Sequence, residues 1–204
     1  MEEQPRFTWL RKLLKDMSGA YAEIGVCHGG LSEFLLKETP VGRLFCIDPY
    51  RKFDDALYVD TLNSMSQQDM NIKYLQVWHR LKGNYISRVE LIRECSVYAA
   101  MLFPKDSMDF VYIDANHSFN AVRMDIMTWI LKIKPGGILA GDDVESLDLP
   151  HVDGNARIVH STGAYSDCGV HAALEAVRAD NPWFDYQVVG NQWFWRRPLI
   201  SRKE

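Results

Sequence analysis

Residues 20–30, AYAEIGVCHGG, decide the fold class of this chain. The stretch from Ala20 to Val26 is apolar enough for a buried strand, and the three glycines that follow or interrupt it predict a turn. A helix is predicted next, from Leu31 to Lys37. A strand that gives way to a helix through a glycine turn is typical of a sheet covered by helices.

The rest of the chain repeats this alternation of short β-rich runs and helical stretches. Strands are predicted at Arg43–Asp48, Arg88–Cys95, Met108–Asp114 and Ile138–Ala140. Helices are predicted at Phe7–Met17, from Asp54 to about Leu81, at Val97–Phe103 and at Val170–Val177. The second of these is expected to break near Met70-Asn71. A further helix is predicted from the spacing of Val122, Ile126, Trp129, Ile130 and Ile133, which would share one face. Phe184–Val189 and Gln192–Arg196 flank Gly190-Asn191, which predicts a terminal hairpin. We therefore expect an α/β fold in a single domain over residues 1–204, with residues 1–19 as an N-terminal helix.

The composition of the chain indicates which kinds of partner and which cellular compartment to expect. The 204 residues are 47% hydrophobic and 25% charged, the balance of a globular chain, and the net charge of −4 argues against nucleic acid as the main partner. No apolar run approaches the roughly 20 residues of a membrane helix, and Met1–Pro5 does not resemble the start of a secretory signal. Four scattered cysteines suggest neither a disulfide framework nor a zinc site. These features predict a cytoplasmic protein without a membrane partner.

The segment 144–168 has little periodicity. A stretch of this length without a pattern is uncommon inside a domain unless it is functional. We expect it to form a lid over a bound substrate.

The first motif has the form acidic-x-Gly-x-x-x-Gly, from Glu23 to Gly29. Glycines let the backbone turn sharply and approach a ligand, and the next helix points free N–H groups at an anionic group. Asp48 follows 23 residues after Gly25 and ends the next predicted strand, where a carboxylate can accept both hydroxyls of a ribose. The alternatives are a glycine turn required only for packing and an Asp-Pro turn.

Together with these two motifs, three further segments resemble the class I S-adenosylmethionine-dependent methyltransferases, in particular a branch of small-molecule and sugar O-methyltransferases. The segments are Asp109–Ser118, the helix with Asp125 and Trp129, and Lys134–Asp143. The terminal Gly169–Ala173 helix and the hairpin are also similar, so the likeness covers about Ala20 to Arg197. It implies a Rossmann-like sheet of seven mostly parallel strands, with the last strand inserted antiparallel and helices on both faces.

The resemblance also implies which residues bind S-adenosylmethionine. Glu23, Gly25 and Gly29 would hold its methionine end, Asp48 its ribose, and Tyr50 would lie near the adenine. Glu94-Cys95-Ser96 stands where many relatives have Gly-Asp-Ser or Gly-Asp-Ala, so the usual acidic group near the adenine is missing. The full expected cofactor set is Glu23, Gly25, Cys27, Gly29, Asp48, Tyr50, Cys95, Ser96 and Asp114.

A metal site is predicted from three carboxylates. If the strands ending at Asp114 and Asp143 are neighbours, then Asp114, Asp142 and Asp143 could share Mg²⁺. Because consecutive strand residues point to opposite faces, Asp142 and Asp143 can both reach the ion only if the chain has already left the strand. The alternative is that one carboxylate caps a helix or pairs with a basic residue.

His117 lies three residues after Asp114 and is the expected general base, acting at that aspartate's site. Alternatively, His117 has only a structural role at the start of the helix that begins near Ser118. His151 and His160 are the other candidates for the general base. The expected activity is methylation of a small-molecule hydroxyl assisted by the metal. Three alternatives stay open: a metal-independent methyltransferase acting on O or N, a catalytically silent adenosyl-binding domain, and a metal-dependent hydrolase. The methyl acceptor is not indicated by the sequence, and a homo-oligomer is compatible with it.

Overall fold

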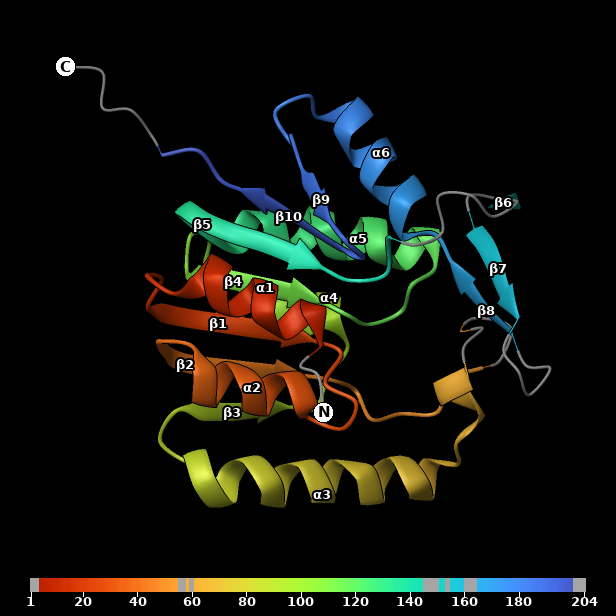
Figure 1. The fold of residues 1–204 in the computed structure, drawn as a ribbon. Coiled ribbons are helices and arrows are strands. Elements are labelled where there is room, and N and C mark those ends of the chain that lie inside the picture. Colours follow the sequence, from red (N-terminus) through yellow and green to blue (C-terminus); the bar gives the residue numbers. More distant parts are fainter. Residues whose placement is uncertain are drawn as a thin grey trace.

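Seven strands form the main sheet of the computed structural model, in the order β3-β2-β1-β4-β5-β10-β9 (Figure 1). The structure describes residues 4–54, 58, 61–144, 151–152, 155–159 and 165–199. The strands are β1 (Gly19–Ile24), β2 (Val41–Ile47), β3 (Val89–Ile92), β4 (Met108–Ile113), β5 (Ile133–Gly141), β9 (Gln187–Val189) and β10 (Gln192–Arg196). β1 to β5 are parallel, and β10 runs antiparallel between β5 and β9. The predicted fold class, including the inserted antiparallel last strand, is confirmed.

Helices cover both faces of this sheet (Figure 1). One face packs against α1 (Pro5–Leu14), α2 (Gly30–Glu38) and α3 (Gln67–Tyr85). The other packs against α4 (Ser96–Ala100), α5 (Phe119–Trp129) and α6 (Val170–Asp180). Two short 3₁₀ helices, η1 (Thr61–Ser64) and η2 (Ile130–Lys132), precede α3 and follow α5.

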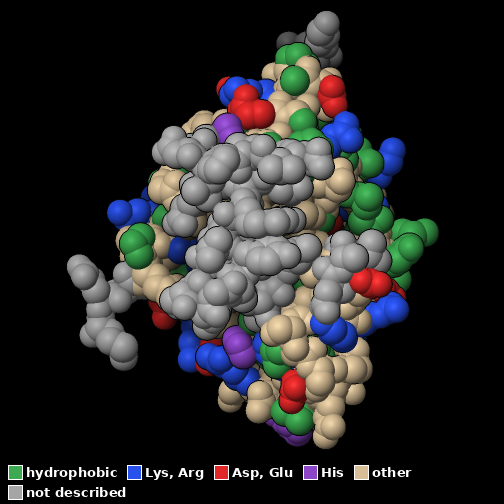
Figure 2. Space-filling model, turned by 90° about the vertical axis from the view of Figure 1, so that its right-hand side faces the viewer, with side chains coloured by type: hydrophobic (Ala, Val, Ile, Leu, Met, Phe, Trp, Pro, Cys, Tyr) green, Lys and Arg blue, Asp and Glu red, His purple; other side chains and the backbone are tan. Residues whose placement is uncertain are grey.

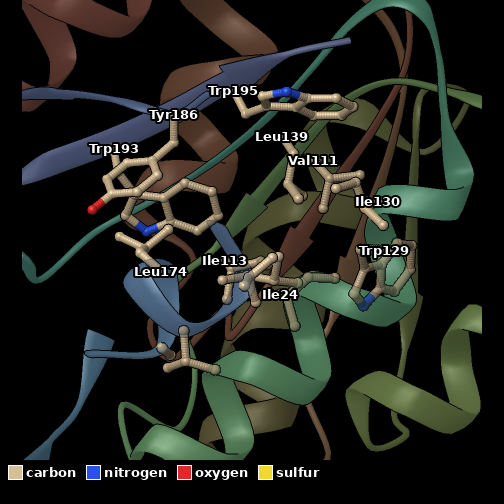
Figure 3. Close-up of a cluster of buried hydrophobic side chains, with 14 of the residues drawn as sticks. Ile24, Val111, Ile113, Trp129, Ile130, Leu139, Leu174, Tyr186, Trp193 and Trp195 are labelled. Atoms are coloured by element: carbon tan, nitrogen blue, oxygen red, sulfur yellow. The ribbon is translucent and has the colours of Figure 1, made fainter. Parts of the chain in front are cut away.

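Alternation along the central strands separates the two hydrophobic clusters. In β4, Phe110 and Tyr112 point to the α1–α3 side, whereas Val111 and Ile113 point to the α4–α6 side. Successive strand residues face opposite sides, and all four of these side chains are at most 5% exposed. Figure 3 shows part of the cluster on the α4–α6 side, in which Trp129 from α5 lies beside Ile130. Val111 and Leu139 of the strands belong to the same cluster. Burial on both faces explains why the central strands are mostly apolar.

Three local predictions are wrong. The predicted helix does not begin at Asp54: Asp54 is not helical, Thr61–Ser64 forms the 3₁₀ helix η1, and α3 begins only at Gln67. No break occurs near Met70-Asn71, because α3 runs unbroken from Gln67 after a capping box between Ser66 and Asp69. Ile133 does not continue the helical face of α5. It begins β5 and pairs with Met108 of β4, so sheet pairing overrides a helical spacing that the sequence alone favours.

Part of the predicted lid segment forms a second, antiparallel sheet. Its strands are β6 (His151–Val152), β7 (Asn155–Val159) and β8 (Tyr165–Cys168). In Figure 1 this sheet lies to the right of the main sheet, on the side where the parallel strands end. Residues 145–150, 153–154 and 160–164 lie outside the described residues, so a lid over 144–168 stays a prediction. Among the described helices, none has the length and apolar character needed to cross a membrane.

Candidate functional site

A cavity of about 360 Å³ opens at the carboxyl ends of β1, β2 and β4. This is the edge where ligands bind in open α/β sheets, and the volume is in the range of small-molecule sites. Most of the predicted cofactor residues line it, namely Gly25, Cys27, Asp48, Tyr50, Cys95, Ser96 and Asp114. Glu23 and Gly29 are not among its lining residues.

Gly25 is held in a conformation and at a distance that only glycine allows. Its φ angle is +87°, and a Cβ added to it would lie 2.0 Å from the carbonyl oxygen of Asp114. The loop after β1 therefore passes directly against the loop after β4. This contact brings two of the predicted site segments together at one end of the cavity.

Asp48 organises the glycine loop from the neighbouring strand. Its Oδ2 accepts hydrogen bonds from the backbone N–H groups of Val26 and Cys27, both at 3.0 Å. Its Oδ1 accepts a third from the N–H of Tyr50 at 2.8 Å. Each carboxylate oxygen can accept more than one bond, so capacity remains for the predicted ribose contact.

Glu23 lies under the loop instead of facing the cavity. It is 1% exposed and accepts a hydrogen bond from the hydroxyl of Ser32 on α2. Burial raises the pKa of Glu23 to about 8, although the Ser32 bond favours the ionised form. Gly29 is the N-cap of α2, with φ +72°. Both residues position the loop and α2, and their direct contact with the cofactor stays a prediction.

We expect Glu23→Gln to change how stability depends on pH. The pKa of Glu23 rises from 4.5 in the unfolded chain to about 8 in the folded one, so unfolding releases a proton between these values. Folded stability therefore falls as pH rises from about 4.5 to about 8, by up to about 1.4 kcal/mol per pH unit from this group. In urea unfolding at pH 5, 6, 7 and 8, the free energy of unfolding of the variant should rise relative to that of the wild type as pH rises. Glu38→Gln, an exposed carboxylate on α2, is the control, and parallel curves for Glu23→Gln would contradict the expectation.

Two other residues that line the cavity, Ser96 and Asp125, belong to a buried hydrogen-bonded chain. The indole N–H of Trp129 donates to the Ser96 hydroxyl oxygen at 2.8 Å, and that hydroxyl bonds to the Asp125 carboxylate. Asp125 also lines the cavity, and burial raises its pKa to about 6. A carboxylate is therefore present near Cys95, in the region where the family resemblance implied that the usual acidic group near the adenine is missing. The signal in the sequence was an aspartate on the apolar face of a helix.

Three predicted polar residues meet next to the cavity. One ligand atom each from Asp114, His117 and Asp143 lies within 4.8 Å of the others. Nε2 of His117 is 3.4 Å from Oδ1 of Asp114 and 3.2 Å from Oδ2 of Asp143. Asp143 has a φ of +64° and follows the end of β5, so the chain has left the strand where this side chain joins the cluster.

Asp142 is directed to other partners. Its Oδ2 accepts a bond from the guanidinium of Arg6 at 2.6 Å, and its Oδ1 accepts bonds from the Gln192 side chain at 2.9 Å and from the Asp143 N–H at 3.0 Å. The same Arg6 nitrogen lies 3.0 Å from Oδ2 of Asp114. Arg6 is in the first turn of α1, more than 100 residues from both partners, and no local pattern in the sequence marks it.

The charges of this cluster affect one another. Burial opposes ionisation of Asp114, but His117 and Arg6 outweigh it and hold the pKa of that carboxyl below its usual value. Burial raises the pKa of Asp143, and the neighbouring carboxylates of Asp142 and Asp114 add to this effect. The site therefore concentrates negative charge that one guanidinium compensates only in part.

Sequence comparison identifies the chain. A family model described as a methyltransferase domain matches residues 22–144, which include the glycine loop, Asp48 and the acidic cluster. The chain belongs to this methyltransferase family. It is an S-adenosylmethionine-dependent enzyme, and the predicted resemblance is confirmed. None of the curated proteins matches the sequence.

Solved structures of several methyltransferases share the fold of this methyltransferase. The O-methyltransferase TomG from Streptomyces achromogenes, involved in tomaymycin synthesis and solved with S-adenosylmethionine, is 16% identical with a TM-score of 0.62, covering 98% of this chain and 82% of TomG. A Burkholderia thailandensis 1,6-didemethyltoxoflavin N1-methyltransferase with bound S-adenosylhomocysteine is 12% identical (TM-score 0.55; 96% and 77% covered). An rRNA methylase from Streptococcus thermophilus is 13% identical (TM-score 0.56; 97% and 99% covered). Acceptors as different as these show that the fold alone does not identify the acceptor.

Proposed function

We propose that this methyltransferase methylates a hydroxyl group of a small molecule, with a divalent cation held by Asp114, His117 and Asp143. The observation that carries the proposal is the position of Asp114. It lines the cofactor cavity and also belongs to the three-residue cluster. A group bound at the cluster would therefore lie next to the cofactor.

The residues present fit a metal ion. Two carboxylates and an imidazole within 4.8 Å of one another form a compact donor set. Counting Asp142, three carboxylates lie in this region, and the Arg6 guanidinium pairs with two of them, Asp114 and Asp142, which leaves negative charge for a divalent cation. An imidazole among the donors favours Mn²⁺ or another transition ion over the Mg²⁺ expected from the sequence. Asp142, the third ligand predicted from the sequence, is replaced in this donor set by His117.

A bound cation would lower the pKa of an acceptor hydroxyl. The chain's own part is to hold the reactants: the Gly25 loop and Asp48 shape the cofactor cavity, and Asp114 joins it to the acceptor side. In the reaction the acceptor oxygen forms a bond to the methyl carbon while the methyl–sulfur bond breaks. The products are the methyl ether, S-adenosylhomocysteine and a proton. Alignment of oxygen and methyl group supplies much of the rate.

Arg6 favours a second candidate, a metal-independent methyltransferase acting on oxygen or nitrogen. Its guanidinium already binds Asp114 and Asp142, so part of the negative charge is compensated from within the chain. In that case His117 would be free of a ligand role and could accept the proton of the acceptor. The ligand and base roles of His117 exclude each other, so metal removal separates the two candidates.

Surface charge supports a small-molecule acceptor over nucleic acid. Figure 2 shows the molecule from the side where the parallel strands end, and the described basic and acidic side chains around this face are interspersed. The net charge of −4 agrees with this interpretation.

The proposal is tested by methyl transfer from isotope-labelled S-adenosylmethionine to a panel of phenols, catechols, sugars and amines, followed by mass spectrometry. The metal-dependent candidate predicts transfer to a hydroxyl that is lost with EDTA and restored by Mn²⁺. Activity that survives EDTA would establish the metal-independent candidate. Transfer only to an RNA oligonucleotide would contradict both.

A further inference from the structure

A lysine occupies a core position of α3. Lys73 shares the buried face of this helix with Met70, Val77 and Leu81, at helical spacings of three and four residues. It is 6% exposed and lines the cavity at the carboxyl ends of the strands. A buried ammonium is costly unless an anion accompanies it, so its position calls for a partner.

Within the described part of the chain, that partner is weak. The hydrogen bond found for Lys73 goes to the sulfur of Cys27, 3.9 Å from the ammonium nitrogen. A thiol is a poor acceptor, and burial raises the pKa of Cys27, which disfavours the thiolate. The carboxylate of Asp48 lines the same cavity, but its hydrogen bonds in the described residues come from three backbone N–H groups, and no ion pair joins it to Lys73. Among the described residues, therefore, no carboxylate pairs with the ammonium of Lys73 at the cavity wall.

The cofactor of a methyltransferase carries one anionic group. Adenine and ribose are uncharged, the sulfonium and ammonium are positive, and the α-carboxylate alone is negative. Cys27, the neighbour of Lys73, belongs to the glycine loop predicted to hold the methionine end. We propose that Lys73 binds the α-carboxylate of S-adenosylmethionine. The proposal rests on the cofactor assignment and assigns its amino-acid end to the α3 side of the cavity.

A ligand pair separates this role from a structural one. S-adenosylhomocysteine carries the carboxylate, whereas 5′-methylthioadenosine has the same adenosyl thioether without the amino-acid group. In calorimetry, Lys73→Met should weaken binding of S-adenosylhomocysteine by about 10- to 100-fold and change that of 5′-methylthioadenosine less than about threefold, because only the first ligand loses a charge-assisted contact. Lys73→Arg should recover part of the lost affinity.

Binding of 5′-methylthioadenosine also reports whether Lys73→Met folds. Equal weakening of both ligands, or unchanged binding of both, would overturn the assignment of Lys73. Absence of S-adenosylhomocysteine binding by the wild-type chain would instead overturn the cofactor assignment and Lys73's role together. Failure of the Lys73 role thus differs from failure of the cofactor assignment in a single set of titrations.

Discussion

Gly25→Ala is expected to abolish useful cofactor binding. The added Cβ would lie 2.0 Å from the Asp114 carbonyl oxygen and 2.6 Å from its carbonyl carbon, both backbone atoms that no rotamer change can move away. Alanine would also be strained at φ +87°. The loops after β1 and β4 must therefore separate. A displacement of this kind at a binding site reduces affinity for S-adenosylhomocysteine by about 100-fold or more.

The same substitution should destabilise the fold. Backbone strain and overpacking together cost about 2 to 4 kcal/mol in the free energy of unfolding. Gly30→Ala is the matched control, because a Cβ there meets no atom within 4 Å and Gly30 begins α2. It should keep wild-type affinity and stability to within about 1 kcal/mol. Wild-type affinity in Gly25→Ala would show that the contact between the two loops does not shape the site.

His117→Gln is expected to have the second large effect. Under the proposed function His117 is a metal ligand, so its loss should weaken Mn²⁺ binding by about 100-fold, and methyl transfer should fall by about 10² to 10⁴. Calorimetry with Mn²⁺ measures the first effect and the labelled-cofactor assay the second. S-adenosylhomocysteine affinity should stay nearly unchanged, because His117 does not line the cofactor cavity.

His79→Gln is the control, since His79 is an exposed histidine on α3 far from the cluster in sequence. The contrary result is equally specific. If His117→Gln loses activity and keeps Mn²⁺ affinity, and the rate no longer falls at low pH, then His117 is the general base and the ligand assignment is wrong.

Local patterns in the sequence determined the fold class and the edge of the sheet that carries the site. Apolar strands ending in glycine or aspartate are recognisable within a few residues, and parallel strands bring their carboxyl ends together. This is why Gly25, Asp48 and Asp114 were predicted, and the structure places all three around one cavity. Glu23, predicted by the same motif, lies beneath the loop because the strand alternation turns its side chain toward Ser32 on α2.

Tertiary structure alone decided which charged side chains pair with one another. Arg6 reaches Asp142 across 136 residues, and nothing near either position signals the pair. Asp143 points toward His117 and Asp142 points away from it, because the backbone of Asp143 is left-handed after the end of β5. Two adjacent aspartates in a sequence do not predict such a backbone angle. Strand and helix propensities act over neighbouring residues, whereas electrostatic partners are selected by the packing of elements distant in the chain.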